Sequence, residues 1–474
     1  MNKKGFVLST YVYMLLVFFL LLLGTMLAVL NNTRLLSEKL KEQSGITSGL
    51  VDKDFSFILL GDKDIVQGKG IELTDPGYRI QTSKGTDLSD IVKVESNVNY
   101  NVVGSYTITY TATHNGITKE LVRNVDIVEN IGATYIRNLY LEGSTDLQEP
   151  MVEIDGVETS TGVRYVGANP ANYVYFNCEP KDSSGVSYGK AGYSYSTSCE
   201  KWRIIGVFDV DRTINGVRTT ESRVKIIRDP FTSTNNSTGF MSAIWDSSDA
   251  SINTGWGINQ WGEIKDESGN ITYEGADLMR LLNGYYIKKA NATCVYCTSL
   301  KQATCQATSE CNNIKQINEF SLRMLEYAIW SIRPGTTSSV SQAYISERTA
   351  TPISCKTDGS AANCNDEIQR TAEWEGKIGL LYPSDYGYAS LGACASLGNA
   401  TCGNSNWLNI GTDYSSITPN QSTTYGYYAY GPSKNGNIGA SAGSKAFRPT
   451  LYLKSTVNIA TGDGTEENPY ILSI

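Results

Sequence analysis

An apolar segment near the start of the chain, Gly5 to Leu30, constrains this sequence more than any other feature. From Phe6 to Leu30 it contains no charged residue. As an α-helix, with a rise of roughly 1.5 Å per residue, this segment is ~37 Å long, enough to cross a hydrocarbon core of about 30 Å with some tilt. The sequence therefore predicts a transmembrane helix over 6–30, with the membrane as the first expected partner.

The flanks of this segment predict its orientation. Lys3 and Lys4 precede it, whereas 31–43 mixes both charges and every cysteine lies much further along. We therefore expect a single-pass protein of the cell membrane, with a cytoplasmic N-terminus and an extracellular C-terminal portion. A cleaved signal peptide has an apolar run of only about 7–15 residues and a small-residue cleavage site, so we expect this longer segment to remain as an anchor.

The first residues, Lys3-Lys4-Gly5-Phe6-Val7-Leu8, resemble the start of type IV prepilins. In that family a basic leader ends in Gly, and a peptidase cuts before the following Phe. The resemblance implies processing between Gly5 and Phe6 and a pilus-like assembly as a partner. It is incomplete, because Thr10 stands where the family usually has a Glu. An uncleaved signal anchor is the alternative reading.

The residues that follow the anchor predict a short helical stalk over 31–44, since Leu35, Leu36 and Leu40 recur at near-helical spacing. The first 44 residues are net positive, so the remainder is more acidic than the whole chain's charge of −8. Because nucleic-acid binding depends on basic residues that neutralise phosphates, we expect no nucleic-acid partner.

The ten cysteines all lie from Cys178 onward, and an even number in an exported segment favours disulfides. Short spacing predicts three pairs, Cys178–Cys199, Cys355–Cys364 and Cys394–Cys402. The remaining four leave three pairings open: Cys294, Cys297, Cys305 and Cys311. A zinc site built from those four thiolates is the alternative, but such sites belong mainly to reducing compartments. We expect neither a metal nor a cofactor.

The single histidine, His114, lies in a turn-like stretch far from the cysteines. This argues against Ser-His-Asp, Cys-His and His-ligated metal chemistry. Any catalysis would then rest on carboxylates. Glu375 and Asp385 flank the most aromatic stretch and are the candidate pair for a glycosidase, although each is also typical of a solvated loop.

Residues 54–129 have the pattern of an all-β domain. Tyr106, Ile108 and Tyr110 alternate with threonines, which predicts a strand with one buried face. Asn115-Gly116 then predicts a hairpin turn, and about seven short strands indicate a β-sandwich.

This block resembles the bacterial Ig-like modules first named from pesticidal crystal proteins. The resemblance rests on Asp75-Pro76-Gly77, on the strand from Val103 to Thr113, and on the closing run Arg123 to Val128. It implies a spacer that holds another domain away from the cell surface.

Residues 131–474 are rich in Tyr, Trp, Asn, Gly and Ser and predict an α+β distal domain braced by disulfides. Cys199–Phe208 and Arg223–Asp229 predict a hairpin around Asn215-Gly216. We expect a short helix at 276–284, a longer amphipathic helix over 313–332, and a second hairpin that joins 447–454 to 468–472. Asp463-Gly464 is expected in its turn rather than in a calcium loop, because the spaced oxygen ligands of such a loop are absent.

Several stretches of the distal domain resemble an uncharacterised family on surface proteins of Gram-positive bacteria. They are Trp202–Gly206, Lys377–Ala389, Asn406–Leu408 and Arg448–Lys454. The family's pattern is similar to the C-type-lectin-like fold, which formylglycine-generating enzymes share. An oxidase of that type needs a reactive cysteine pair, whereas these cysteines favour structural bridges.

Aromatic residues of the distal domain are the candidate ligand-binding site, because flat amphipathic rings stack on sugars or fill protein pockets. The candidates are Tyr386, Trp407, Tyr414, Tyr425, Tyr427, Tyr428 and Tyr430. We place Trp407 in the core as an alternative and expect the loop from Tyr414 to Tyr430 to be exposed.

The sequence as a whole predicts a multidomain surface protein, ordered as a basic leader (1–5), a transmembrane helix (6–30), a stalk (31–44), an Ig-like sandwich (54–129) and a lectin-like head (131–474). The expected function is adhesin-like binding of an extracellular glycan or protein, without catalysis. A pseudopilin-like structural subunit and a surface enzyme that acts on glycans are the alternatives.

Overall fold

The computed structural model describes residues 55–68, 75–99, 102–128, 131–190, 192–230, 242–243, 245–246, 260–295, 297, 311, 314–352, 369–392, 394–420, 428–441 and 444–474. The predicted leader, anchor and stalk, together with Gly5 and Phe6, lie outside these ranges. Within them, no helix combines the length and apolar character that a membrane crossing needs.

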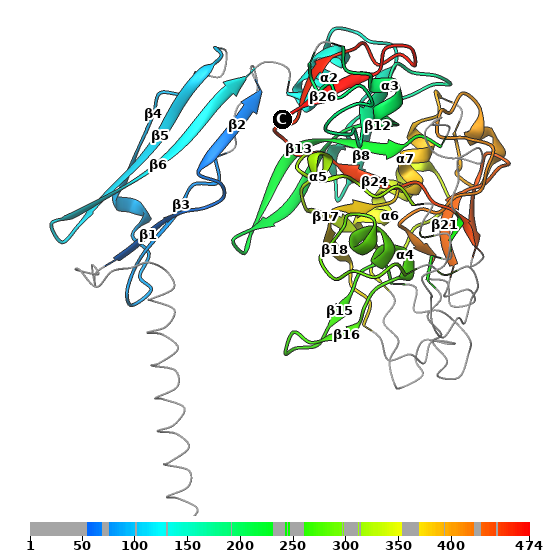
Figure 1. Ribbon diagram of the computed structural model, residues 1–474. Coiled ribbons are helices and arrows are strands. Elements are labelled where there is room, and N and C mark those ends of the chain that lie inside the picture. The colour runs from blue at the N-terminus through cyan, green and yellow to red at the C-terminus, as the bar shows by residue number, and fades with distance from the viewer. Residues whose placement is uncertain are drawn as a thin grey trace, which may run out of the picture. The chain divides into compact units, whose positions relative to one another are not determined.

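The segment from Phe55 to Val128 is built from strands in two sheets (Figure 1). A two-stranded sheet pairs β1 (Phe55–Leu59) with β3 (Tyr78–Thr82). A four-stranded sheet has the order β2-β6-β5-β4, in which β2 (Asp64–Gly68) runs parallel to β6 (Ile117–Val128). The other two strands are β5 (Gly104–His114) and β4 (Val92–Ser96), and η1 (Ser89–Ile91) precedes β4. This all-β arrangement confirms the class predicted for 54–129.

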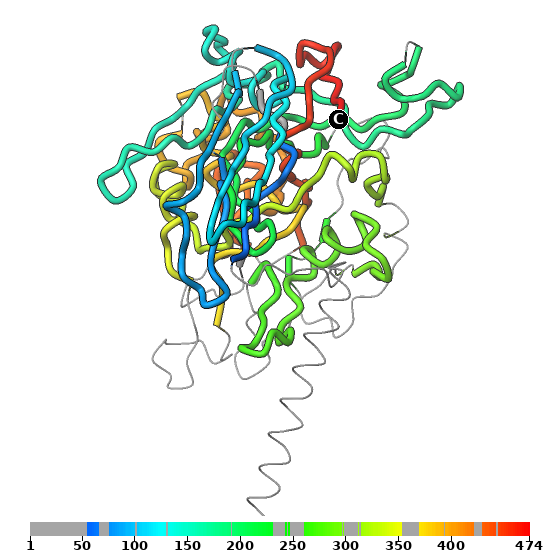
Figure 2. Tube along the Cα trace, turned by 90° about the vertical axis from the view of Figure 1, so that its left-hand side faces the viewer, coloured from blue at the N-terminus to red at the C-terminus, as the bar shows by residue number. Residues whose placement is uncertain are grey.

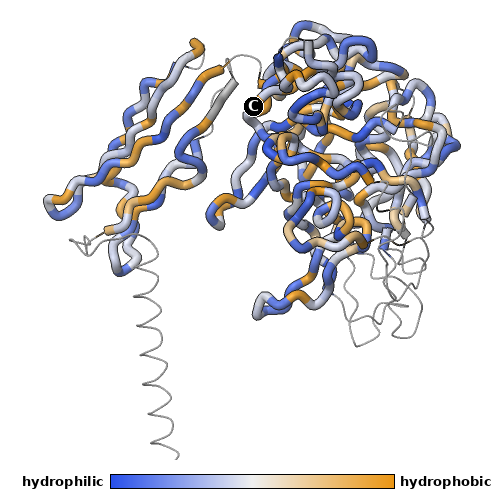
Figure 3. Tube along the Cα trace, in the orientation of Figure 1, coloured by the Kyte–Doolittle hydropathy of each residue, from blue (hydrophilic) through white to orange (hydrophobic). Residues whose placement is uncertain are grey.

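The predicted alternation along β5 is confirmed for Ile108 and Tyr110, whereas Tyr106 is only partly buried. Ile108, Tyr110 and Ala112 are buried, whereas the residues between them are more exposed. Figure 3 shows the same interruption of hydrophobic residues by hydrophilic ones along these strands. The turn between β5 and β6 is Asn115-Gly116, and both residues have positive φ, as a two-residue hairpin turn of this type requires.

The distal domain is organised around a nine-stranded sheet with the order β19-β24-β13-β12-β11-β26-β25, to which β10 and β7 are attached. Its longest strands, β12 (Glu200–Ile214) and β13 (Val217–Arg228), form the predicted hairpin around Asn215-Gly216. The other strands are β7 (Leu147–Gln148), β10 (Val163–Tyr165), β11 (Tyr173–Phe176), β19 (Ile378–Gly379), β24 (Thr450–Tyr452), β25 (Asn458–Thr461) and β26 (Tyr470–Ser473).

A close approach between β10 and β12 depends on glycine. Gly206 pairs with Arg164, and the register of the β12–β13 hairpin shifts between Ile204 and Gly206. A Cβ at Gly206 would overlap the carbonyl oxygen of Val163, so only glycine lets the two strands meet here. This pairing fixes Arg164 against the middle of the sheet.

Short strands form the remaining sheets of the distal domain. They are β8 (Met151–Ile154) with β9 (Val157–Ser160), β14 (Ser242–Ala243) with β23 (Lys445–Ala446), β15 (Ile264–Lys265) with β16 (Ile271–Tyr273), β17 (Ala328–Ser331) with β18 (Glu373–Gly376), and β20 (Pro419–Asn420) with β21 (Tyr428–Pro432) and β22 (Ile438–Ser441). The β15–β16 hairpin extends away from the rest of the distal domain (Figure 1, Figure 2).

The helices in the described part of the distal domain are short. They are α2 (Gly132–Leu141), α3 (Tyr195–Ser198), α4 (Asp277–Arg280) with its π-helical continuation η2 (Leu281–Tyr285), α5 (Glu319–Leu322), α6 (Val340–Thr349), α7 (Pro383–Tyr388) and the 3₁₀ turn η4 (Ala400–Gly403). The helix predicted at 276–284 is present, but it continues through Gly284 to Tyr285.

The amphipathic helix predicted over 313–332 is wrong. Within 314–332, the described part of this stretch, only α5 is helical, and Asn318 caps it by accepting a hydrogen bond from the Ser321 amide at 2.8 Å. The chain then leaves the helix, because Ala328–Ser331 pairs with β18 and the Trp330 indole donates to the carbonyl of Gly376. Strand pairing outweighs helical periodicity in this stretch.

The predicted C-terminal hairpin is confirmed in its second half alone. β26 pairs with β25, whereas Thr450–Tyr452 of the predicted first arm forms β24 in the middle of the large sheet, between β13 and β19. Asp463 lies in the connection, where its carboxylate accepts from the amide and hydroxyl of Thr465.

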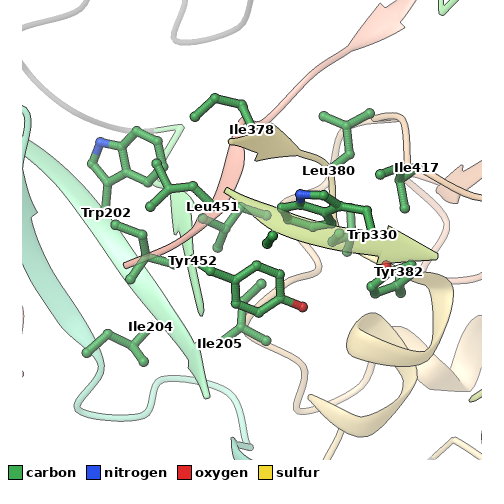
Figure 4. Close-up of a cluster of buried hydrophobic side chains, with 14 of the residues drawn as sticks. Trp202, Ile204, Ile205, Trp330, Ile378, Leu380, Tyr382, Ile417, Leu451 and Tyr452 are labelled. Carbon is green, nitrogen blue, oxygen red and sulfur yellow. The ribbon is translucent and has the colours of Figure 1, made fainter. Parts of the chain in front are cut away.

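A cluster of buried hydrophobic side chains lies where β17 packs against β24 of the large sheet (Figure 4). Trp330 and Tyr452 have ring centroids 4.8 Å apart, and Leu451 and Ile378 are paired across β24 and β19. All four residues are buried. Aromatic and aliphatic side chains therefore pack together into a hydrophobic core against this sheet.

Disulfide bonds cross-link several loops of the distal domain. Cys178–Cys199 and Cys394–Cys402 are bonded as predicted. Among the four cysteines whose pairing was open, Cys294 is bonded to Cys311, and Cys297 is also disulfide-bonded. The predicted pair Cys355–Cys364, and Cys305, lie outside the described residues.

Candidate functional site

The described part of the distal domain contains a cleft of about 620 Å³, which we call the hairpin cleft. Its walls come from four places in the chain: the end of β12, the start of the β15–β16 hairpin, the residues before β17, and β18. Its lining residues are Arg212, Thr213, Glu263, Lys265, Glu326, Tyr327, Thr371, Glu373, Trp374 and Glu375. The volume is in the range of small-molecule sites.

Two aromatic rings line the hairpin cleft. Tyr327 is 50% exposed, although large apolar side chains usually lie inside. Trp374 is half-buried, with its ring edge-on to Trp261 at 6.3 Å. A Cβ at Gly262 or Gly376 would overlap the Trp374 ring, so these two glycines leave the space in which the indole lies. The ring is therefore positioned by packing rather than free to move.

Each carboxylate of the cleft has a partner that orients it. Glu326 lies 3.4 Å from Arg212, and Glu263 lies 3.2 Å from Lys265. Glu375 accepts a hydrogen bond of 2.7 Å from the backbone amide of Thr213. These oxygens keep free lone pairs, because a carboxylate can accept about four hydrogen bonds.

Glu373, on β18, is oriented by Arg218 of the β12–β13 hairpin. Its carboxylate receives both terminal nitrogens of Arg218, at 2.7 and 3.3 Å, and Arg218 also pairs with Asp211. Together these two carboxylates raise the pKa of Arg218. The ion pair ties β18 to the β12–β13 hairpin and so fixes two walls of the cleft.

The arrangement in the cleft is suited to recognising hydroxyl groups. Flat rings offer apolar faces, and the oriented carboxylates, threonine hydroxyls and a guanidinium offer acceptors and donors around them. Among the described residues, no group of three or more His, Cys, Asp or Glu side chains could hold a metal ion.

Three of the predicted aromatic residues lie in the core of the distal domain. Tyr386 and Tyr414 are fully buried, and Trp407 is 4% exposed. Each uses its polar atom inside the domain: the Tyr386 hydroxyl donates to Gly436, the Tyr414 hydroxyl to Leu408 and the Trp407 indole to Tyr165. The expectation that Tyr414 is exposed is wrong, because its hydroxyl finds a partner inside the core.

The other predicted aromatics are less buried or lie outside the description. Tyr430 is half-buried on β21, and Tyr428 begins that strand. Tyr425 and Tyr427 lie outside the described residues. Tyr430 does not line the hairpin cleft.

The two candidate carboxylates separate in the structure. Glu375 lines the hairpin cleft, whereas Asp385 lies at the start of α7 with its side chain 1% exposed. The expectation that Asp385 is a solvated loop charge is wrong. It does not line the cleft, so the structure does not place these two carboxylates on opposite sides of one cleft-bound sugar.

Asp385 belongs to a second feature, which we call the buried charge cluster: Arg164, Lys225, Glu347 and Asp385. The Asp385 carboxylate pairs with Arg164 through Oδ1 at 2.7 Å and with Lys225 through Oδ2 at 2.6 Å. Glu347 accepts from both the amide and the hydroxyl of Ser384. The four groups come from β10, β13, α6 and α7 and therefore connect four separate elements of the domain.

Burial governs the protonation of this cluster. It raises the pKa of Glu347 to about 7, against the opposing effects of Arg348 and Ser384. It lowers the pKa of Lys225 to about 8, although Asp385 acts in the opposite direction. Burial would raise the pKa of Asp385 as well, but Lys225 and Arg164 outweigh it and hold that pKa below its usual value.

Comparison with known families identifies one part of the chain. Residues 57–127 match the family of bacterial surface protein Ig-like domains. This segment is an Ig-like module, as its strands and motifs predicted. The match covers neither the N-terminal segment nor the distal domain, so the prepilin-like and lectin-like resemblances remain predictions.

Other comparisons add no relative for the whole chain. No curated protein matches. Among solved structures, a lipoprotein from Bacteroides thetaiotaomicron is 16% identical and covers 37% of this chain and 94% of its own, with a TM-score of 0.15. The CBM51-2 and INT domains of Clostridium perfringens ZmpB, in complex with GlcNAc, are 9% identical and cover 37% of this chain and 29% of theirs, also with a TM-score of 0.15. Such scores support no conclusion about this chain.

Apart from Glu375, the cleft residues were missed by sequence reasoning, although a local signal existed. In Glu373-Trp374-Glu375-Gly376 a tryptophan stands between two carboxylates and before a glycine. The pattern is too short to distinguish a site from a surface strand. The exposure of Tyr327 was missed for a different reason. It lies within 313–332, where we predicted an amphipathic helix with a buried face instead of the observed strand β17 and the residues before it.

Proposed function

We propose that this protein is a membrane-anchored surface protein whose distal domain binds an extracellular glycan in the hairpin cleft, without cleaving it. The Ig-like module at 57–127 supports a place on a bacterial surface, since its family is that of bacterial surface proteins. The membrane anchor rests on the apolar segment 6–30.

This proposal rests on one observation: two aromatic side chains, Tyr327 and Trp374, line the same cleft. One ring is half exposed, and the other is held by packing against two glycine positions. An ordered aromatic face loses little entropy when a sugar ring stacks on it, so it can contribute to affinity.

A glycan fits the cleft better than a protein does. The cleft has the volume of a small-ligand site, whereas a stable protein interface buries about 800 Å² on each partner. Its carboxylates are already oriented by partners such as Arg212 and Lys265, and an oriented acceptor suits a sugar hydroxyl.

Binding without turnover is proposed because the carboxylates in the cleft are engaged with cations or amides. A glycosidase needs one carboxyl kept protonated as an acid and a second poised at a fixed separation across the sugar bond. Among the described residues, the carboxyl whose pKa is raised to about 7 is that of Glu347, a buried side chain outside the cleft.

The test is a binding measurement with the full-length chain against an array of neutral, amino and acidic oligosaccharides. We expect binding to at least one neutral or amino class, and about tenfold or greater weakening in Tyr327→Ala and in Trp374→Ala. Tyr327→Phe should keep most of the affinity because it keeps the ring.

Leu141→Ala is the matched control, since Leu141 is an exposed apolar side chain on α2 outside the cleft. It should bind as the unmodified chain does. Absence of binding to every glycan, or binding that survives both aromatic substitutions, would contradict the proposal. Release of shorter sugars during incubation would favour the enzyme alternative instead.

A further inference from the structure

A lysine and an aspartate far apart in sequence meet in the centre of the distal domain. Lys225 Nζ lies 2.6 Å from Oδ2 of Asp385, and each side chain is only 1% exposed. Lys225 comes from β13 and Asp385 from the first turn of α7, 160 residues later. The two groups are in contact and are shielded from water.

Aromatic rings surround the lysine nitrogen. Nζ lies 4.4 Å from the centroid of the Tyr382 ring, 5.2 Å from that of Tyr452, 5.4 Å from that of Trp330 and 5.6 Å from that of Phe208. Figure 4 shows three of these side chains, Trp330, Tyr382 and Tyr452, in the same part of the core. Burial among them lowers the pKa of Lys225 to about 8, so the neutral, nucleophilic amine is accessible near physiological pH.

The two oxygens of Asp385 have different surroundings. Oδ1 faces the guanidinium of Arg164 at 2.7 Å, whereas Oδ2 faces Lys225 and accepts from the Tyr382 amide at 2.9 Å. One oxygen is therefore held by a fixed cation, and the other lies beside a proton donor.

We propose that Lys225 and Asp385 condense to an intramolecular amide. The bond that forms joins Nζ of Lys225 to Cγ of Asp385, and the bond that breaks is Cγ–Oδ2. Starting from an ammonium and a carboxylate, two ammonium hydrogens leave with Oδ2 as one water, and the third remains on the amide nitrogen. Charge and atoms balance, and no oxidant, reductant or co-reactant is required.

Arg164 is positioned to assist the addition step. As Nζ adds to Cγ, negative charge develops on Oδ1, the oxygen that the guanidinium already contacts. A fixed cation at a developing oxyanion in a site closed to water is an effective form of electrostatic stabilisation. After water leaves, Oδ1 is the amide carbonyl oxygen and can still accept from Arg164.

Proximity and burial favour the product. Groups held in contact react with effective molarities of about 10⁵–10⁸ M when their geometry is suitable. The ion pair keeps two charges out of water, whereas an amide removes both and needs only ordinary hydrogen bonds. The product links β13 covalently to α7 and closes a large loop of the distal domain.

The test is peptide mapping of the full-length chain after disulfide reduction and digestion with trypsin. An amide at Lys225 blocks cleavage there, so Val224–Arg228 should remain intact and be joined to Ile378–Lys434, with a total mass lower by one water. Without the amide, trypsin should release Ile226–Arg228 and leave Ile378–Lys434 unbranched.

Recovery of the branched peptide from the unmodified chain, and its loss in Lys225→Met, would support the amide. Stoichiometric recovery of the two linear peptides would overturn it. The unmodified chain alone decides the question, so a failure of Lys225→Met to fold does not affect the result. Arg164→Met should yield a smaller branched fraction than the unmodified chain if the guanidinium assists the reaction.

Discussion

The guanidinium of Arg123 lies 2.9 Å from the carboxylate of Asp75, and the same group donates hydrogen bonds to the carbonyls of Leu60 and Gly77. Arg123 is fully buried. The two ends of the Ig-like motif, Asp75-Pro76-Gly77 and the closing run that begins at Arg123, are therefore joined through a single side chain. This contact explains why widely separated residues carry the resemblance together.

Arg123→Met should destabilise the Ig-like module by about 3 kcal/mol, because it leaves buried carbonyls without their donor and removes the cation that pairs with the Asp75 carboxylate. Hydrogen exchange of the full-length chain should show faster exchange across 55–128 and little change in the distal domain. Asn124→Ala is the matched control. It removes an exposed contact to Asp64, so its effect should be within about 0.5 kcal/mol. Equal effects of the two substitutions would show that the buried contact has no special role.

Gly376→Ala should disturb the hairpin cleft without touching a ligand. A Cβ at this position overlaps the Trp374 ring, so the indole must move, at a cost of about 1–3 kcal/mol. Glycan binding should weaken roughly as it does in Trp374→Ala. Gly439→Ala is the control, since no atom lies within 4 Å of a Cβ placed there. Unchanged glycan binding in Gly376→Ala would mean that the position of Trp374 is not needed.

Local patterns predicted the hairpins well. The Asn-Gly turns at 115–116 and 215–216 were readable because both residues must adopt positive φ, and few other pairs do so easily. Short cysteine spacings predicted two disulfides for a similar reason, since nearby residues meet without knowledge of the fold.

Contacts between segments that are far apart in the chain could not be predicted from local sequence patterns. The stretch around Trp330 has helical periodicity, but it pairs with β18, which lies more than forty residues later. Asp385 looks like a loop charge until Arg164 and Lys225 are brought to it from other strands. The hairpin cleft has the same origin, because its walls come from four separate segments. Tertiary packing decides such features, and a single sequence does not encode them locally.

Removal of the Cys178–Cys199 disulfide should loosen one loop rather than the whole domain. The bond closes a loop with a sequence separation of 21, and a loop of this size corresponds to about 3 kcal/mol in the chain-entropy account. Inside the loop, the Tyr188 hydroxyl donates to Leu472 and the Tyr193 hydroxyl donates to Glu179.

In Cys178→Ala/Cys199→Ala, hydrogen exchange should increase across 179–198 while β12 and β13 stay protected. Cys394→Ala/Cys402→Ala is the comparison, and its effect should be confined to the region of η4. Loss of protection throughout the large sheet in the first variant would show that the bond supports the core itself.

Because of Glu347, the free energy of unfolding of the distal domain should fall as pH rises from about 4.5 to about 7. Burial raises its pKa in the folded state to about 7, above the ordinary value of 4.5, so the folded state binds more protons than the unfolded state in this window. Stability therefore falls with increasing pH across the window and is level above it. The full shift corresponds to roughly 3 kcal/mol.

Glu347→Gln should remove this dependence, because the amide is neutral at every pH and can still accept a hydrogen bond from Ser384. We expect the melting temperature of the variant to exceed that of the unmodified chain at pH 8 and to approach it at pH 5. Glu153→Gln, at an exposed position on β8, should leave the pH profile unchanged. A Glu347→Gln profile that runs parallel to that of the unmodified chain would show that Glu347 carries the same charge in the folded and unfolded states.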